Sequence, residues 1–525
     1  MLKIRIVKSS PSSTSKFIQI VLRRGRRTTV VEHIGSGKTD DEIKRLCNIA
    51  QQKIEGKTLS AGAKPLFPEM FGRVNVAAKP AGRDEAGSTS AKTEISSKGL
   101  RFFEIGDIEI KRVYHNLAYE YLSNYYESLG FNGLKNNLAK DLAIVRIIEP
   151  ASKIKSIELL SKYFNINYTK NMLFKNLGKI IALKHKAECL AVRYANSKLK
   201  FDFSLVFYDV TTLYFECFQS DSLRKCGYSK DNKANQPQIM IGLVVNEDGF
   251  PLITQVFEGN TFEGKTMIPI VASLKKKFNM KTLTVVADSA MLSFENMANL
   301  KLAEINYIVG ARLSNLPQDK IKDISTAINK QENHIFKTQT ANGLLLCDYS
   351  EKRASKDRSD RNKEVLRAKY QISNPALAVK RHRFVKEETK SVFVLNSALI
   401  EKAECLEGLK GYYTSLEGIE DSLVIARYKE LWHVEKSFRI AKSDLSARPV
   451  YLRKRECIEA HILIVFLALC MAKAIELETK KSIKSVVEAL WELLDVEITD
   501  KETGQTYLKR MVQDPTPNLK IQDRK

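Results

Sequence analysis

The run FSLVFYDVTTLYFE, residues 203–216, limits what this chain can fold into more than any other stretch. Apolar and β-branched residues fill it, without the regular polar alternation of a strand that has one face in water. Such a run is typical of a strand covered on both faces, as in the sheet of an α/β protein. Asp209 interrupts the run, and a carboxylate in that place is costly unless it is paired, hydrogen-bonded or bound to a metal ion.

The segments that follow have the order three strands, helix, strand, helix, strand. Two apolar runs joined by the turn NEDG have the pattern of an antiparallel hairpin, and helical and strand patterns then alternate. The predicted elements after the first strand are strands at 237–245 and 250–259, a helix at 264–278, a strand at 283–288, a helix at 291–303 and a strand at 306–311.

Asp288 is the second carboxylate of interest, because it ends the apolar run LTVVAD. Ligand sites of α/β sheets favour the carboxyl ends of strands. Taken alone, Asp288 is better explained as the N-cap of the next helix. If its strand lies beside the strand of Asp209, however, the two carboxylates repel each other, and a cation between them removes the repulsion. Ligands that are all oxygen favour Mg²⁺ or Mn²⁺.

The stretch YKELWHVEKSFRIAK, residues 428–442, is predicted to be a helix whose apolar stripe packs on the sheet. Glu435 lies on that stripe, so it can point at the sheet and supply a third carboxylate. The alternative is that Glu435 pairs with Arg439 at i+4 and that Lys442 reaches solvent. Residues on the stripe, by helical spacing, are Tyr428, Leu431, Glu435, Phe438 and Lys442.

The charge balance predicts a polyanionic partner. The chain has 85 Lys and Arg against 61 Asp and Glu, a formal net charge of +24, and a large protein this basic usually meets nucleic acid. Eight cysteines show no C-x-x-C pair and no zinc-site spacing, which favours a reduced, cytoplasmic protein. The longest apolar run, ILIVFLALCMA, is shorter than a membrane span and is predicted to be a core helix, so no membrane partner is expected.

The stretch IGSGKTDDE resembles the end of a phosphate-binding loop but does not complete it. The motif needs a glycine at position 32, where this chain has Glu32. Thr39 and Glu42 instead have the spacing of a helix capping box. No nucleotide cofactor is therefore predicted.

Changes in composition divide the chain into seven segments. The first contains two predicted strands joined by the basic turn RRGRR, followed by a helix; the third is helical, and a DNA-binding domain and a plain packing domain explain it equally well. The segments are a small basic module (1–55), a linker (56–104), a helical domain (105–198), a first core part (199–314), an insertion (315–420), a second core part (421–496) and a C-terminal tail (497–525).

Together these blocks resemble the DDE transposases of bacterial insertion sequences, specifically the IS-four type. The signature of that family is Tyr, two residues, Arg, three residues, Glu, six residues, Lys. Tyr428, Glu435 and Lys442 fall on it, and Leu431 replaces the arginine. Downstream, the family's Arg-Pro and His block is matched by Arg448 with Pro449 and by His461.

The resemblance implies an RNase H-like catalytic domain, a mixed sheet flanked by helices and split by a mostly β insertion. It also implies that Asp209, Asp288 and Glu435 are catalytic and hold two divalent ions, Mg²⁺ or Mn²⁺. Tyr428 and Lys442 would contact DNA phosphate. Further DNA-contact candidates are Arg439, Arg448, Lys352 and Arg353, although the charged segment 351–369 is equally well explained as a solvated helix face.

The implied function is that of a transposase acting on double-stranded DNA. It would bind the terminal inverted repeats of its element, cleave the strands and transfer them to a target, as a homodimer in the synaptic complex. Two alternatives remain open at this point: a metal-dependent nuclease that never joins strands, and a DNA-binding protein whose catalysis has decayed.

Overall fold

The computed structural model divides the chain into two compact units, Met1–Glu94 and Ile95–Lys525. The predicted linker 56–104 lies outside the described residues. The structure describes residues 2–8, 16–24, 27–37, 39, 42–44, 46–47, 50–51, 108–216, 219–229, 235–291, 293–374, 382–389 and 392–511.

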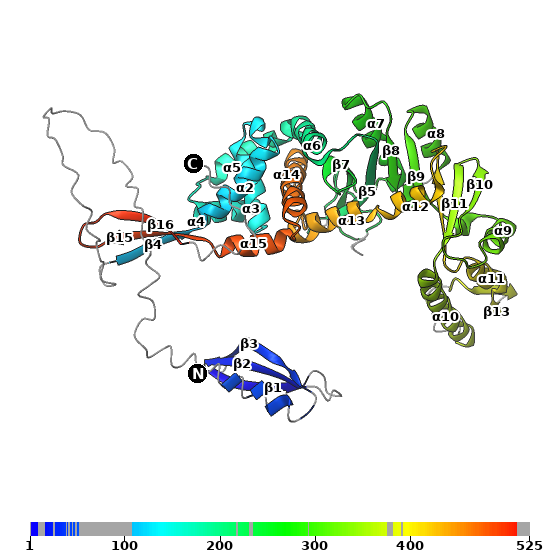
Figure 1. Ribbon diagram of the computed structural model, residues 1–525, viewed down its shortest axis with the longest axis horizontal. Helices are drawn as coiled ribbons and strands as arrows, with labels where there is room; N and C mark the ends of the chain where they lie inside the picture. Colours follow the sequence, from blue (N-terminus) through cyan, green and yellow to red (C-terminus); the bar gives the residue numbers. More distant parts are fainter. Residues whose placement is uncertain are drawn as a thin grey trace. The chain divides into compact units, whose positions relative to one another are not determined.

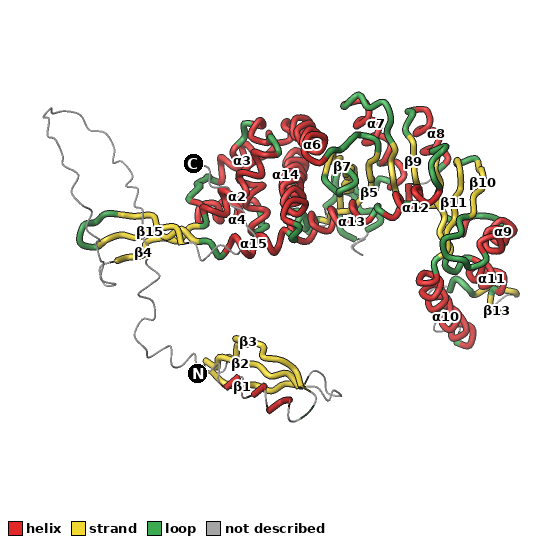
Figure 2. The backbone as a smooth tube through the Cα atoms, in the orientation of Figure 1, coloured by secondary structure: helices red, strands yellow, loops and turns green. Residues whose placement is uncertain are grey.

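The first unit contains a three-stranded antiparallel sheet in the order β1-β2-β3 (Figure 2). Its strands are β1 (Leu2–Lys8), β2 (Lys16–Arg24) and β3 (Arg27–Gly37). The sequence analysis found β2 and β3 and missed β1. The predicted capping box is confirmed: the N–H of Thr39 donates to Glu42 Oε2 at 3.2 Å, and the N–H of Glu42 donates to Thr39 Oγ1 at 3.3 Å.

The second unit is built on an eight-stranded mixed sheet in the order β10-β11-β14-β9-β8-β5-β6-β7. Strand β5 pairs in parallel with β8 and β8 with β9, whereas β6 is antiparallel to both β5 and β7. This order and these directions are those of an RNase H-like core, so the predicted fold class is confirmed. The core strands are β5 (Leu205–Tyr214), β6 (Gln238–Val245), β7 (Pro251–Glu258), β8 (Thr284–Ala287) and β9 (Asn306–Ala311), with helices α7 (Met267–Lys277) and α8 (Phe294–Leu302).

The insertion differs from the expected mostly β segment. Three of its strands extend the catalytic sheet beyond β9, because each finds an antiparallel partner there, and its charged segment forms the long helix α10. Helices account for more of its residues than strands do. Its elements are α9 (Gln318–Ile328), β10 (Phe336–Thr340), β11 (Gly343–Tyr349), α10 (Glu351–Ser373), β12 (Val385–Thr389), β13 (Val392–Leu395), α11 (Ser397–Cys405) and β14 (Leu409–Thr414).

Helix α14 (Arg455–Thr479) lies between the helical region and the sheet, with α2 and α3 against it on one side and β7 on the other (Figure 1). It is long and apolar enough to cross a membrane, but 94% of its most apolar window is buried inside the protein. Burial, rather than shortness, therefore identifies it as the predicted core helix. The helical region comprises α2 (Asn116–Ser128), α3 (Asn137–Ile148), α4 (Lys153–Phe164), α5 (Lys170–Leu177) and α6 (Lys184–Leu199).

The segment assigned to a C-terminal tail begins with structure instead. After α15 (Ile483–Trp491), strands β15 (Leu494–Asp500) and β16 (Thr506–Met511) form a hairpin, and β4 (Ile108–Tyr114) pairs with β15 to make a three-stranded sheet. Leu494–Asp500 alternates apolar and polar residues, which is the pattern of a strand, and the sequence analysis overlooked it. Residues 512–525 lie outside the described part of the chain.

The predicted helix at 428–442 is interrupted. It consists of the end of α12 (Asp421–Lys429), helix α13 (Trp432–Arg439) and a π-helical turn, η8 (Ile440–Asp444). Tyr428 therefore belongs to α12 and Glu435 to α13. The stripe is still largely buried: Tyr428, Leu431 and Phe438 are each less than 9% exposed.

Candidate active site

The sheet register brings the two aspartates together. Strands β5 and β8 run in parallel, and Tyr208 on β5 pairs with Ala287, the last residue of β8. Asp209 directly follows Tyr208 on β5, and Asp288 directly follows Ala287 at the end of β8. Because paired strands lie about 4.8 Å apart, the backbones of the two aspartates come close.

Helix α13 covers the sheet face toward which Asp209 points. The ring of Phe207, two residues before Asp209, lies 6.4 Å from the ring of His433 on α13. On the other side of Asp209, Thr211 lines a small cavity together with Lys442 from η8. Alternate residues of a strand share a face, so Asp209 faces α13 and η8. It is half-buried there.

Asp288 is held by two hydrogen bonds to its Oδ1 atom. The N–H of Ser289 donates at 2.7 Å, and the hydroxyl of Tyr428 donates at 3.3 Å. Asp288 directly precedes the short 3-10 helix η5 (Ser289–Met291), and its carbonyl accepts from the N–H of Met291 at 3.0 Å, whereas Ser293 is the N-cap of α8. The tyrosine reaches Asp288 across Gly310 of β9, where a Cβ atom would lie 2.5 Å from the Tyr428 hydroxyl.

The charges of both Asp288 and Glu435 act on Tyr428. Burial raises the pKa of its phenol, and the nearby charges of Asp288 and Glu435 raise this pKa further. Tyr428 therefore stays a neutral hydrogen-bond donor at any physiological pH. Glu435 itself is exposed, in the first turn of α13.

Lys410 is a charged residue of this site that the sequence analysis missed. It lies on β14, half-buried, with its ammonium 4.6 Å from the centroid of the Tyr428 ring. Burial lowers the pKa of Lys410, as does the charge of Arg353, whereas Asp348, Asp288 and Glu435 oppose this shift. The ammonium thus places a positive charge beside two of the three predicted catalytic carboxylates.

Asp348 gives the signal by which Lys410 can be found. Like Asp288, it stands near the end of an apolar run, LLLCDY, and the sheet register pairs it with Lys410. Asp348 is buried and accepts a hydrogen bond from the Tyr412 hydroxyl at 3.0 Å. It also forms ion pairs with Arg353 and Lys429, each at 3.4 Å.

The predicted DNA-contact residues do not form one group. Arg353 is bound to Asp348 and donates to the carbonyl of Gly408 at 3.0 Å, so it belongs to the network of Lys410. Lys352 and Arg439 are exposed, on α10 and α13. Arg448 lies 5.8 Å from the centroid of the Tyr214 ring and lines a different cavity.

Leu431, in the place of the signature arginine, packs in the hydrophobic core with 7% exposure. The two basic residues near it in sequence are engaged elsewhere. Arg427 pairs with Glu247 at 3.3 Å and with Glu430 at 3.2 Å, and Lys429 pairs with Asp348. Neither takes the place of the arginine.

The ligand chemistry fits a hard divalent ion, because all three candidate side chains offer carboxylate oxygen. The geometry is open: across the described residues, no three His, Cys, Asp or Glu are grouped so as to hold an ion as they stand. The described ion pairs also include none between Glu435 and Arg439, so the alternative role for Glu435 is not realised. Glu435 is thus free of a competing cation on its own helix.

Comparison with known proteins identifies the family. Residues 201–471, just over half of the chain, match the family model described as the transposase DDE domain. The chain belongs to this family. It is a DDE-type transposase, and divalent metal ions are the cofactors of such enzymes.

Among solved structures, a piggyBac transposase in a synaptic complex with hairpin DNA is similar to this transposase at 10% identity, with a TM-score of 0.35. The similarity covers 67% of this chain and 68% of that one. A comparison with curated proteins gives no match.

Proposed function

We propose that this transposase binds the terminal inverted repeats of an insertion sequence of the IS-four type, cleaves the DNA strands and transfers them to a target. The observation that carries the proposal is the adjacent register of Asp209 and Asp288, with the hydroxyl of Tyr428 on Asp288 and the charge of Glu435 beside that tyrosine. The proposed site would combine carboxylates from a strand, a strand end and a helix.

Asp209, Asp288 and Glu435 would hold two divalent ions, Mg²⁺ or Mn²⁺. When bound, such ions activate a water or a 3′-hydroxyl and stabilise the leaving oxygen of a phosphodiester. Tyr428 orients Asp288 through its hydrogen bond, and Gly310 leaves room for that contact. The exposed position of Glu435 lets it approach the aspartates without breaking a described ion pair.

The proposed phosphate contacts are Lys410 and the residues on either side of α13. Lys410 pairs in register with Asp348 and lies against the ring of Tyr428, and the charges of Asp288 and Glu435 act on it, so its ammonium could meet a phosphate that enters near the proposed metal ligands. Lys442 and Tyr428 flank the same helix. Arg439, Arg448, Lys352 and Arg353 are further candidates, of which Arg353 must give up part of its bond to Asp348.

The proposed partner is double-stranded DNA, bound by a homodimer in the synaptic complex, in the bacterial cytoplasm. The net charge of +24 supports a polyanionic partner. Binding to duplex DNA should weaken steeply with salt, because each neutralised phosphate releases counterions. Binding that does not respond to salt would contradict this part of the proposal.

The test of the reaction is Mg²⁺-dependent nicking of a duplex that carries the terminal repeats. Asp209→Asn and Asp288→Asn should each lower the nicking rate by more than about a hundredfold, since each removes a metal ligand, while DNA binding is kept. Asp202→Asn is the matched control, because Asp202 is exposed and bonds to Ser204. Nicking by Asp209→Asn or Asp288→Asn at the wild-type rate would refute their assignment as metal ligands.

A strand-transfer assay separates the proposal from a nuclease. Joined product with a target plasmid, formed only when the terminal 3′-hydroxyl is present, is the outcome expected of a transposase. Nicking without joined product would favour the nuclease. A protein that binds DNA and shows neither product would be a decayed enzyme.

A further inference from the structure

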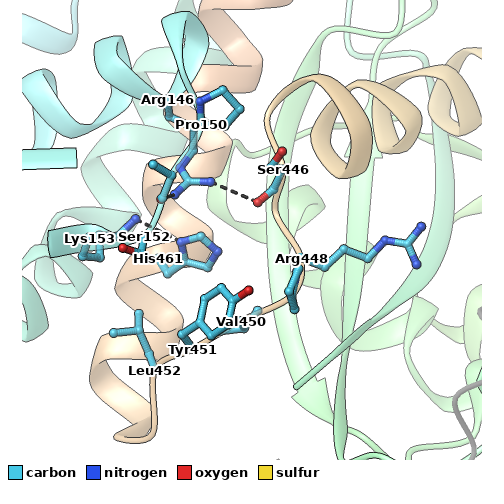
Figure 3. Close-up of a pocket in the computed structure, with 12 residues that line it drawn as sticks. Arg146, Pro150, Ser152, Lys153, Ser446, Arg448, Val450, Tyr451, Leu452 and His461 are labelled. Atoms are coloured by element: carbon cyan, nitrogen blue, oxygen red, sulfur yellow. Dashed lines mark hydrogen bonds between the residues drawn. The ribbon is translucent and has the colours of Figure 1, made fainter. Parts of the chain in front are cut away.

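A cavity of about 300 Å³, which none of the three carboxylates lines, opens between the helical region and the core (Figure 3). One wall is formed by the end of α3 and the start of α4. The other is formed by the chain after η8 and by α14. It is lined by Arg146, Pro150, Ala151, Ser152, Lys153, Ser446, Arg448, Pro449, Val450, Tyr451, Leu452 and His461.

The charged side chains that line this cavity are all basic. Arg146, Lys153 and Arg448 carry positive charge, and the lining includes no aspartate or glutamate. Arg146 is 3% exposed and Lys153 is 6% exposed. Buried cations normally have an anionic partner, because their desolvation is costly.

Arg146 bonds to carbonyl groups alone. It donates to the carbonyls of Leu445 at 2.8 Å, Ser446 at 3.1 Å and Ala151 at 2.9 Å. Its Nε atom is buried and has no hydrogen-bond partner among the described residues. These bonds fix the chain after η8 to the end of α3, but they leave the guanidinium charge uncompensated.

Lys153 and His461 form a contact between two basic groups. Lys153 Nζ lies 3.1 Å from His461 Nδ1, and His461 Nε2 lies 3.1 Å from the carbonyl of Ala447. The carbonyl requires a proton on Nε2, so Nδ1 of the neutral ring accepts from the ammonium. Burial and the nearby charges of Lys153 and Arg146 hold the pKa of His461 well below its usual range. Lys153 therefore has a neutral partner where an anion would stabilise it more.

We propose that this cavity binds one phosphate group. The volume has room for such a group with several waters, at roughly 30 Å³ of liquid volume per water. Arg146 and Lys153 supply two buried cations, which is the chemistry that phosphate oxygens require. The guanidinium of Arg448 points away from them, toward the ring of Tyr214 (Figure 3). The first turn of α4, which begins at Lys153, adds the positive end of a helix to the same wall.

In the DNA complex, the bound group is a backbone phosphate; this part rests on the function proposed above. Val450 in the cavity wall forms a parallel bridge with Phe215, which directly follows β5. Along β5, Tyr214 is about 17 Å from Asp209 at about 3.4 Å per residue. A DNA strand that is bound at the three carboxylates can therefore reach the cavity within a few nucleotides.

The first experiment uses the full chain and inorganic phosphate. Phosphate is titrated at constant ionic strength, and the unfolding temperature is measured for wild type, Lys153→Met and Lys155→Met. Lys155 is the matched control, because it is exposed on the same helix and pairs with Glu158 at 3.3 Å. Wild type and Lys155→Met should show a saturable rise in unfolding temperature, because a ligand that binds only the folded state stabilises it.

Lys153→Met should bind phosphate at least about thirtyfold more weakly, as expected when one partner of a buried charge contact is removed. Without phosphate it should unfold at the same temperature or higher, because it no longer buries an uncompensated ammonium. Lys153→Gln, whose amide can still donate to His461 Nδ1, provides a second weakened variant should Lys153→Met fold poorly. Equal phosphate responses in wild type and in the cavity variants would overturn the proposal.

The second experiment identifies the source of the phosphate. Affinity for a duplex is measured against salt, and Lys153→Met should lower the slope of log affinity against log salt by about one, whereas Lys155→Met should not. A lost phosphate response with an unchanged slope would assign the cavity to free phosphate instead. Because neither experiment requires DNA cleavage, failure of the proposed reaction and failure of this site give different results.

Discussion

Charge is balanced differently in the carboxylate site (Asp209, Asp288 and Glu435) and in the basic cavity that Arg146 and Lys153 line. At the carboxylate site, Asp288 and Glu435 lie near Lys410, so charges of both signs offset one another within the protein. In the basic cavity, Arg146 and Lys153 meet only carbonyls and a neutral histidine. The first region therefore has carboxylates that the proposed metal ions would neutralise, and the second has buried cations that the proposed phosphate would neutralise.

The largest expected effect is a loss of stability when a second cation, besides Lys410, is placed near the carboxylate site. Leu431→Arg would restore the signature arginine, but at a core position with 7% exposure. We expect the free energy of unfolding to fall by about 3–4 kcal/mol, because a buried charge without a partner is strongly destabilising. Urea unfolding measures it. Trp432→Arg is the control, at 51% exposure; equal stability of Leu431→Arg and wild type would show that the site accepts the arginine.

A smaller effect concerns the contact that holds Asp288. Tyr428→Phe removes the hydroxyl that donates to Asp288 at 3.3 Å and leaves the ring in place. The nicking rate should fall about tenfold, as expected for about 1.4 kcal/mol from one hydrogen bond to a charged group. Tyr370→Phe, at an exposed position, should nick at the wild-type rate. A wild-type rate for Tyr428→Phe would mean that Asp288 is positioned by Ser289 alone.

The smallest effect sharpens the description of the basic cavity. His461 stays neutral in the folded protein, whereas in the unfolded chain it takes up a proton near its ordinary pKa of 6.5. The unfolded state then binds more protons below pH 6.5, so stability is lost as the pH falls through that value. Lys153, whose pKa is also lowered by burial, adds a dependence of the same sign between that lowered pKa and the ordinary value of 10.5.

His461→Gln should reduce this loss below pH 6.5 by up to about 1.4 kcal/mol per pH unit. Glutamine can still accept from Lys153 and donate to the carbonyl of Ala447. His334→Gln, at an exposed position, should leave the pH profile as in wild type. A steeper loss of stability in His461→Gln would show that the histidine is protonated in the folded protein.

The core strands could be predicted from the sequence because each of them has a strand pattern within its own short stretch of residues. The apolar run around Asp209, the hairpin after it and the apolar run that ends at Asp288 each contain their own pattern, and each became a strand of the sheet. The signature spacing likewise located Glu435 and Tyr428. These are features that one stretch of residues determines.

Long-range pairing explains what the sequence did not show. Lys410 gains its place only because β14 lies between β9 and β11, a neighbourhood set by tertiary contacts. The contact of Lys153 with His461 joins residues more than 300 positions apart. The strands after α15 are a different case, because the alternation of Leu494–Asp500 is a local strand signal that was overlooked; only the pairing of β15 with β4, from the other end of the unit, is long-range.

The central claim is that Glu435 joins the two aspartates in catalysis, although the structure leaves it exposed. Mg²⁺-dependent nicking of the terminal-repeat duplex by Glu435→Gln tests this directly, with Glu430→Gln as the control from the residue that pairs with Arg427. Glu435→Gln should bind the duplex normally and nick more than about a hundredfold more slowly, as a missing metal ligand requires. Nicking by Glu435→Gln at the rate of Glu430→Gln would contradict it.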